Sequence, residues 1–212
     1  MSDNILVIAP HADDEILGVG GSMQKHVEAG DQVHVVIVTD RHNMLHQRAQ
    51  AEKTKDIIGH DQIHWCGLKD EYTDICMNDI IKPLERVYQS VLPDVVYTCH
   101  RGDINIDHQA VFKASTVVCR AMQSNPVRSF FSYETPSSTE QGLLHAFVPN
   151  YYVTLNQNHV DRKAGAFLLY DDEIREQPNP RNQIGLEDRA RFRGSECNSK
   201  FAEAFVLLRN II

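Results

Sequence analysis

The feature that most constrains the fold is the alternation of short apolar runs with longer segments of helical periodicity. The apolar runs, each predicted to be a strand, cover residues 4–10, 32–40, 61–67 and 93–100. The helical patterns cover residues 14–30, 45–59, 78–92 and 106–122. Strands that alternate with helices in this way form βαβ units and a mostly parallel sheet. The chain is therefore expected to adopt an α/β fold in which helices flank a mostly parallel sheet.

The C-terminal third departs from this pattern. Strands are predicted at residues 127–136 and 150–155, and helices at residues 159–170 and 186–205. Neither an internal repeat nor a linker interrupts the sequence. Residues 1–212 are therefore expected to form a single domain with extra C-terminal strands and helices.

Glycine and proline give the first helices their expected details. Gly18 and Gly21 are poor helix formers within the first helix, and they predict close packing against a neighbouring element. Gly30 and Gly59 are expected to end the first two helices. Pro83 is expected either to kink the third helix or to mark its start.

The composition excludes several classes of partner. The formal charge is −8, and an acidic chain repels phosphate backbones and anionic lipids, so we expect neither nucleic acid nor a membrane surface as a partner. No apolar run approaches the roughly 20 residues of a membrane span, and no signal peptide is recognised. The five cysteines include no CxxC pair, which indicates reduced thiols in a cytoplasmic protein.

The residues that follow the predicted strands predict a metal site. Ligands of parallel sheets bind beyond the carboxyl ends of the strands. His11 and Asp14 follow the first strand, three residues apart, and His108 opens the helix after the fourth strand. Two imidazoles and one carboxylate suit zinc and leave a position open for water and substrate, as in catalytic sites.

The neighbours of these ligands have expected supporting roles. Asp13 is free to take a proton from water that a metal ion has made acidic. Glu15 is expected in the first helical turn, as a cap, as a support for a ligand or as a substrate contact. Asp107 is expected to orient an imidazole. The alternative without a metal is purely structural. The segment around His11 would then be a solvated helix start, and the segment around His108 an Asx turn followed by a capped helix.

With these residues in view, the chain resembles the LmbE/PIG-L-like N-deacetylases. The stretch APHADDEILGVGG is similar to the family signature P-H-x-D-D-E, and HQRAQAEKTKDIIG and DINIDHQAV are similar to its later motifs. The resemblance implies a Rossmann-like α/β sheet and a zinc-dependent enzyme that removes acetyl groups from N-acetylated amino sugars. It also implies an assembly of several identical chains, so a homo-oligomer is expected.

The resemblance carries residue roles with it. It implies zinc ligation by His11, Asp14 and His108, a general base at Asp13, and a supporting charge at Asp107. Other residues are expected to contact the substrate: Arg48, Asp103, Tyr133 and Glu15.

The second family motif is commonly H-P-D-H, and this chain has Asn105 at its first position. Asparagine donates a hydrogen bond but does not transfer a proton at neutral pH. Either Asn105 stabilises the oxyanion alone, or His100 reaches in from the preceding strand end, with Tyr133 as a further candidate donor.

The expected activity is therefore hydrolytic N-deacetylation with zinc or another divalent cation, acting on an amino sugar or sugar conjugate. Two alternatives stay open. One is a metal amidase with a non-sugar N-acyl substrate. The other is a nucleotide-sugar or sugar-phosphate binding protein without hydrolytic activity, for which a group of arginines is the candidate anion site: Arg162, Arg181, Arg189, Arg191 and Arg193.

Overall fold

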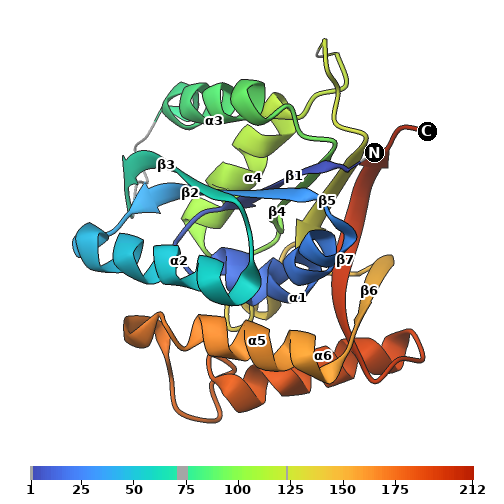
Figure 1. The fold of residues 1–212 in the computed structure, drawn as a ribbon. Coiled ribbons are helices and arrows are strands. Elements are labelled where there is room, and N and C mark those ends of the chain that lie inside the picture. The colour runs from blue at the N-terminus through green and yellow to red at the C-terminus, as the bar shows by residue number, and fades with distance from the viewer. Residues whose placement is uncertain (1, 71–75, 123) are drawn as a thin grey trace.

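The architecture is a seven-stranded sheet between layers of helices, seen in a computed structural model that describes residues 2–70, 76–122 and 124–212 (Figure 1). The strand order is β3-β2-β1-β4-β5-β7-β6. The first five strands are parallel, and β7 is antiparallel to both of its neighbours. The strands are β1 (Asn4–Ala9), β2 (Gln32–Asp40), β3 (Gln62–Lys69), β4 (Val95–Cys99), β5 (Ser129–Tyr133), β6 (Tyr151–Leu155) and β7 (Phe201–Asn210). The expectation of a mostly parallel α/β sheet is confirmed.

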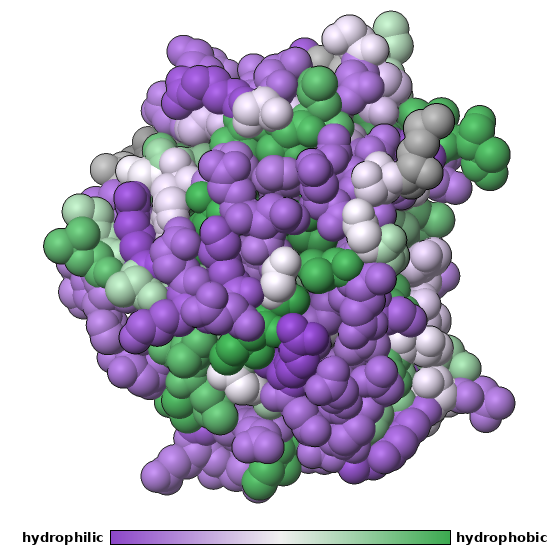
Figure 2. Space-filling view, viewed as in Figure 1, coloured by the Kyte–Doolittle hydropathy of each residue, from purple (hydrophilic) through white to green (hydrophobic). Residues whose placement is uncertain are grey.

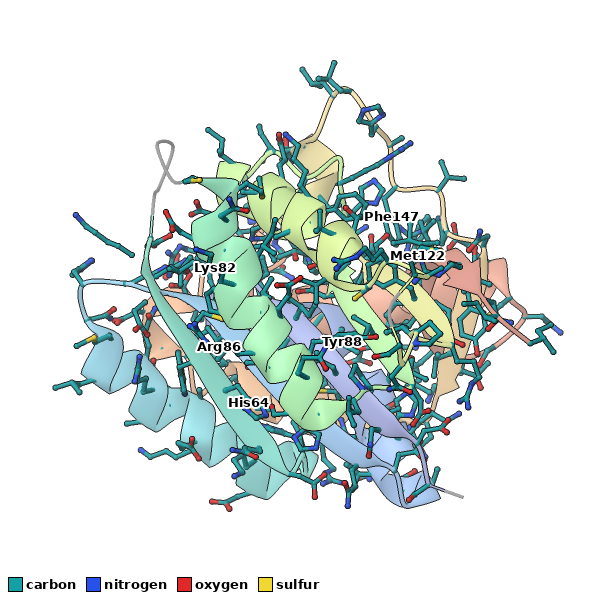
Figure 3. The ribbon with its side chains drawn as sticks, turned by 90° about the horizontal axis from the view of Figure 1, so that it is seen from above. His64, Lys82, Arg86, Tyr88, Met122 and Phe147 are labelled. Carbon is teal, nitrogen blue, oxygen red and sulfur yellow. The ribbon has the colours of Figure 1, made fainter. Side chains whose placement is uncertain are left out.

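Helices cover both faces of this sheet. In Figure 1, α3 and α4 lie above it, whereas α1, α2, α5 and α6 lie below it, with α5 and α6 outermost. The helices are α1 (Asp14–Ala29), α2 (Met44–Ile58), α3 (Met77–Val91), α4 (Ile106–Val118), α5 (Gln157–Phe167) and α6 (Gln183–Glu196), with short 3₁₀ turns at Thr139–Gln141 and Asp171–Glu173. Seen from above, α3 and α4 run side by side over the sheet (Figure 3). No helix in the described ranges is long and apolar enough to cross a membrane.

The central strands owe their place to their apolar side chains. β1 is buried on both faces from Ile5 to Ala9, as expected of a parallel strand covered by helices on both sides. It pairs with β2 on one side and β4 on the other, so its carboxyl end lies between two other strand ends. The backbone N–H and the hydroxyl of Thr39 both donate to the carbonyl of Pro10, which fixes the turn after β1 against the end of β2. The exterior is largely hydrophilic on the face shown in Figure 2.

Glycines in α1 permit close packing, as predicted. A Cβ atom on Gly18 would lie 2.2 Å from the ring of Tyr133 on β5, and one on Gly21 would lie 2.5 Å from Leu155 on β6. Gly30 and Gly59 cap α1 and α2 with positive φ angles of 85° and 93°, so both predicted helix ends are confirmed.

The structure excludes one of the two alternatives for Pro83, and the chain after Glu196 corrects a predicted helix. Pro83 lies inside α3, which begins at Met77, so the proline does not mark the helix start. The helix predicted at 186–205 ends at Glu196, and β7 occupies an internal position in the sheet instead. The helix prediction was wrong for residues 201–205 because Glu203 favours a helix in the sequence. In the sheet its buried carboxylate accepts hydrogen bonds from α1 and from Lys163.

We predict that Gly18→Ala lowers the free energy of unfolding by about 1–3 kcal/mol, because the added methyl group overlaps the buried Tyr133 ring. Gly165→Ala is the matched control, since its Cβ would meet nothing within 4 Å in α5. That variant should gain up to about 1 kcal/mol from helix propensity. Urea unfolding of both variants measures the difference, and equal stability of the two would contradict the packing account.

Candidate metal centre

The turn between β1 and α1 places three polar side chains at one strand end. His11 follows the strand after Pro10, and Asp14 opens the helix. Asp13 lies between them with a φ angle of 137°, a strained value for a residue other than glycine. Its backbone N–H donates to Glu15 Oε2 at 3.0 Å, and its carbonyl accepts from two residues of α1. These bonds hold the strained turn, which separates the directions of the Asp13 and Asp14 side chains.

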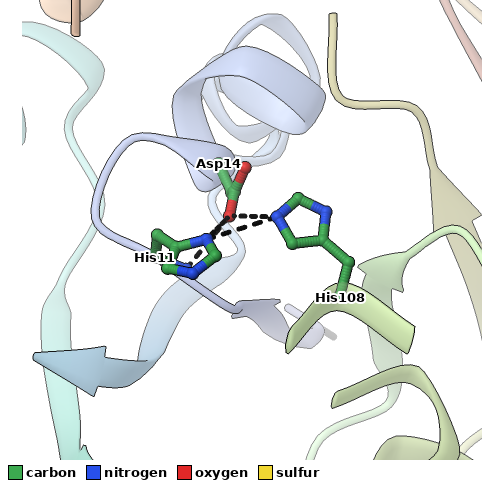
Figure 4. Close-up of side chains that lie close together, drawn as sticks. All are labelled: His11, Asp14 and His108. Atoms are coloured by element: carbon green, nitrogen blue, oxygen red, sulfur yellow. Dashed lines mark hydrogen bonds and ion pairs between the residues drawn. The ribbon is translucent and has the colours of Figure 1, made fainter. Parts of the chain in front are cut away.

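Three ligand-type atoms from this turn and from α4 converge (Figure 4). His11 Nδ1 and His108 Nε2 each lie 3.2 Å from Asp14 Oδ2, and the two nitrogens are 3.3 Å apart. Ligand atoms about 2.0–2.1 Å from a tetrahedral zinc ion are separated by about 3.3 Å. The spacing therefore matches a single ion bound by all three residues.

The surroundings of these three residues, His11, Asp14 and His108, which we call the triangle, also fit a cation. All three residues are buried, and Asp14 is 0% exposed. Asp14 Oδ1 is buried without a hydrogen-bond partner, an unusual cost for a carboxylate unless a ligand uses it. The His₂Asp donor set is of the type that binds zinc with open coordination positions. The residues present thus fit a divalent ion, and zinc in particular.

The electrostatics of the triangle favour positive charge. Burial alone would lower the pKa of His108, but Asp14 and Asp103 outweigh it and raise the value to about 9. Burial likewise opposes the charge on Asp14, yet His108 and His11 hold its pKa well below the usual range. A divalent ion would satisfy the same carboxylates that here stabilise protonated imidazoles.

Asp13 is held apart from the triangle by an arginine of the C-terminal third. Arg181 Nη1 donates to Asp13 Oδ2 at 2.8 Å and to Glu173 Oε2 at 2.9 Å. Asp13 Oδ1 is buried and has no hydrogen-bond partner. Burial and the charge of Asp14 raise the pKa of Asp13, against the opposing effects of Arg181 and Arg41. A carboxylate with one uncommitted oxygen and a raised pKa is suited to accept a proton.

A cavity of about 900 Å³ opens beside the triangle. His11 lines it together with Asp70, Asp107 and Asn105. His11 Nε2 lies 3.0 Å from Asp70 Oδ1 and 3.2 Å from Asp107 Oδ2. The second nitrogen of this imidazole therefore faces carboxylates, which leaves Nδ1 for the triangle.

Asp70 is a cavity residue that the sequence prediction missed, and Arg41 is one to which it assigned no role. Arg41 Nε donates to Asp70 Oδ2 at 3.0 Å, and both residues line the cavity. The rule that sites follow strand ends applies to Asp70, but the predicted strand stopped at Gly67 whereas β3 runs to Lys69. Arg41 directly follows β2, so the same rule selects it.

Two of the expected substrate contacts, Glu15 and Tyr133, lie buried among other partners. Glu15 is buried and accepts hydrogen bonds from the Asp13 N–H and the Tyr170 hydroxyl, while burial raises its pKa to about 8. Tyr133 is 0% exposed and donates its hydroxyl to the carbonyl of Ile8. Both side chains therefore use their polar atoms in buried hydrogen bonds, which favours a structural role over a substrate contact.

Arg48 also differs from its expected role. It pairs with Asp40 through two hydrogen bonds of 2.5 and 3.2 Å, and its guanidinium lies 4.7 Å from the centre of the Trp65 ring. Asp40 lines the cavity but Arg48 does not. The arginine at the cavity is Arg41.

The loop before α4 distributes its side chains differently from the prediction. Asp103, expected to contact the substrate, is fully buried and lies 3.2 Å from His108 Nδ1. Asp107 faces His11 rather than its neighbour His108. Asn105 caps α4 by accepting the Asp107 N–H, and it lines the cavity. His100 instead contacts the carbonyl of His145 and lies outside the cavity lining, so its proposed reach to the substrate is not supported.

The C-terminal arginines do not form the anion site that the binding-protein alternative required. Arg181 is committed to Asp13 and Glu173, Arg193 to Glu134 and Glu196, and Arg189 to Glu134 and Glu140. The remaining two are bound as well, Arg191 to Glu187 and Arg162 to the carbonyl of Ile57.

Comparisons with known proteins show the family to which the chain belongs. The family model described as PIG-L, GlcNAc-PI de-N-acetylase, matches residues 6–119, a span that includes all three residues of the triangle. A protein of Escherichia coli strain K12, named uncharacterized deacetylase YaiS, is 29% identical over 172 residues, or 76% of this chain and 87% of that protein.

Solved structures establish the shared fold. The N,N'-diacetylchitobiose deacetylase of Pyrococcus horikoshii superposes with a TM-score of 0.79 at 19% identity, over 96% of this chain and 83% of that one. GalB of Pseudomonas putida KT2440, a 4-carboxy-2-hydroxymuconate hydratase, superposes with a TM-score of 0.76 at 18% identity, over 100% and 98%. Since one fold carries both activities, the reaction has to be argued from the site.

We predict that the purified protein binds one zinc ion per chain and that His108→Ala weakens this binding more than about 100-fold, because it removes a ligand rather than a supporting residue. His64→Ala is the matched control: His64 and His34 bring their ring nitrogens to 3.4 Å, but they belong to none of the His/Cys/Asp/Glu groups of the described residues that could hold a metal ion. Zinc competition against a chelator measures both. Equal affinity of the two variants would rule out the triangle as the binding site.

Proposed function

Because the chain belongs to the PIG-L family, we propose that it is a zinc-dependent hydrolase that removes an acetyl group from the amide nitrogen of an N-acetylated amino sugar or sugar conjugate. The observation that carries the proposal is the convergence of His11, Asp14 and His108 on one point beside a large cavity, with Asp13 adjacent and unligated. The names of the relatives in Escherichia coli and Pyrococcus horikoshii support deacetylation as the reaction.

The ligands and the base have separate tasks in this proposal. His11, Asp14 and His108 would hold the ion, which supplies polarisation of the amide carbonyl and acidifies water. Asp13 Oδ1, the oxygen that Arg181 does not use, takes a proton from the attacking water while the water oxygen bonds to the carbonyl carbon. Asp13 then returns that proton to the nitrogen as the C–N bond breaks, which releases the free amine and acetic acid, and the acid ionises to acetate in water.

Residues at the start of α4 complete the site. Asn105 uses its side-chain oxygen to cap the helix, so its amide N–H₂ is the group left to donate to the developing oxyanion. Asp107 contacts His11 Nε2 and keeps that ring in place. Asparagine cannot transfer protons, so the scheme assigns both proton transfers to Asp13.

Arg181 supports the base from outside the triangle. Its guanidinium joins Asp13 to Glu173, and Glu173 also accepts a hydrogen bond from Arg41. Two arginines and one glutamate thus connect the C-terminal segment to the cavity wall. These contacts orient the Asp13 carboxylate and leave its Oδ1 without a hydrogen bond.

A metal amidase with a non-sugar substrate is the remaining second candidate. A metal ion bound by His11, Asp14 and His108 would activate an N-acetyl amide whether or not its amine belongs to a sugar. A substrate panel separates the two: N-acetylated amino sugars, N-acetyl amino acids and N-acetylated thiols. Turnover confined to the last two classes would replace the sugar assignment but keep the chemistry. That residues 1–212 act as one domain, as a homo-oligomer in the cytoplasm, stays a prediction.

We predict that Asp13→Asn lowers the rate of acetate release by about 10²–10⁴-fold, the usual contribution of a general base, while zinc still binds with one ion per chain. Asp56→Asn, an exposed aspartate of α2, is the matched control and should keep full activity. Acetate and amine release are measured on the panel above. Near-normal deacetylation by Asp13→Asn would refute the assignment of the base.

A further inference from the structure

Asp103 is the one buried carboxylate of the α4 loop that the scheme above does not use. We propose that Asp103 is a positioning residue that binds the Nδ1–H of His108 and so presents the Nε2 lone pair to the metal site. The inference rests on the proposed metal centre and deepens it, because it assigns the residue that sets the tautomer of one ligand.

The geometry places Asp103 behind the ligand. Its Oδ2 lies 3.2 Å from His108 Nδ1, while His108 Nε2 lies 3.2 Å from Asp14 Oδ2 on the other side of the ring. Asp103 is 0% exposed and His108 is 1% exposed, so no bulk water competes for the contact. The angle of this contact is too bent for an aligned hydrogen bond, and the pairing is therefore electrostatic in the present ring orientation.

Chemistry then fixes which nitrogen carries the proton. A carboxylate only accepts hydrogen bonds, and a neutral imidazole has one N–H. With Asp103 at Nδ1, the proton stays on that atom and Nε2 keeps its lone pair for the ion. This arrangement, in which a carboxylate orients a ligand histidine, is the usual support of histidines at zinc.

The sequence neighbour of His108 cannot do this. Successive residues of an α-helix point about 100° apart, so Asp107 projects away from the His108 ring. Its carboxylate instead lies 3.2 Å from His11 Nε2. The two ligand imidazoles therefore have different carboxylate partners, Asp107 and Asp70 for His11 and Asp103 for His108.

Three other donors hold Asp103 in place. The Thr139 hydroxyl donates to Oδ2 at 2.6 Å, the Ser138 hydroxyl donates to Oδ1, and the Asn105 N–H donates to Oδ1 at 2.9 Å. Ser138 and Thr139 belong to the segment after β5, so Asp103 links that segment to the start of α4. The carboxylate is immobilised from two elements before it meets His108.

A purely structural role is the competing explanation, since Asp103 Oδ1 also forms a turn with the Asn105 N–H. Such a role would change the unfolding midpoint but not the zinc affinity of the folded protein. The test therefore measures zinc affinity, by competition with a chelator, together with the thermal midpoint.

We expect Asp103→Asn to weaken zinc binding about 10–100-fold, because an amide in this position can offer its N–H₂ to Nδ1 and move the ring proton to Nε2. The effect on acetate release should follow the zinc affinity and vanish at saturating zinc. In the zinc-loaded protein, ¹⁵N NMR should show the His108 Nδ1–H exchanging with solvent at least ten times faster in the variant than in the wild type. Asp56→Asn is again the matched control and should change neither quantity.

The outcomes separate this inference from the proposed function. If the wild-type chain binds no stoichiometric zinc, the proposed metal centre fails and this inference fails with it. If the wild type binds zinc and folded Asp103→Asn binds it within twofold, only the positioning role is overturned. Should Asp103→Asn not fold, Thr139→Val decides: loss of one hydrogen bond to the carboxylate should weaken zinc binding about 5-fold, and unchanged affinity overturns the proposal.

Discussion

The site depends on one buried carboxylate, Asp14, that contacts two imidazoles at once. Its Oδ2 lies 3.2 Å from a nitrogen atom of His11 and from one of His108, two residues that are 97 positions apart in the sequence. A charge buried at 0% exposure is costly unless it is paired. Asp14 is paired either with protonated imidazoles or with a divalent ion. The distances between its Oδ2 and the two imidazole nitrogens match those around a tetrahedral ion.

The fold supplies that pairing through the order of its strands. β1 and β4 are neighbours in the sheet, so the turn after β1 and the helix after β4 meet at the same edge. The strained Asp13 backbone is held by Glu15 from within α1, and Asp13 itself is held by Arg181 from the C-terminal segment. Strain in the turn is stabilised by buried hydrogen bonds elsewhere, which is typical of functional sites.

The sequence predicted the parts of this arrangement that follow from local pattern. Apolar runs and helical periodicity identified the parallel strands and their helices, and the strand-end rule selected His11, Asp14 and His108 before any contact was known. Side-chain partners were harder to predict because they are set by tertiary contacts. The sequence suggested that Glu15 and Tyr133 contact the substrate, yet both form buried hydrogen bonds within the protein. The first half of β7 was predicted as helix because Glu203 favours a helix in the sequence, whereas in the fold its carboxylate is buried against Lys163.

The most direct test of the central claim is anomalous diffraction at the zinc absorption edge from crystals of the wild-type protein. The account predicts one strong peak about 2.0–2.2 Å from His11 Nδ1, Asp14 Oδ2 and His108 Nε2. A peak confined to the exposed group of His46, Asp171 and Asp172, or no peak within reach of Asp14, would contradict it.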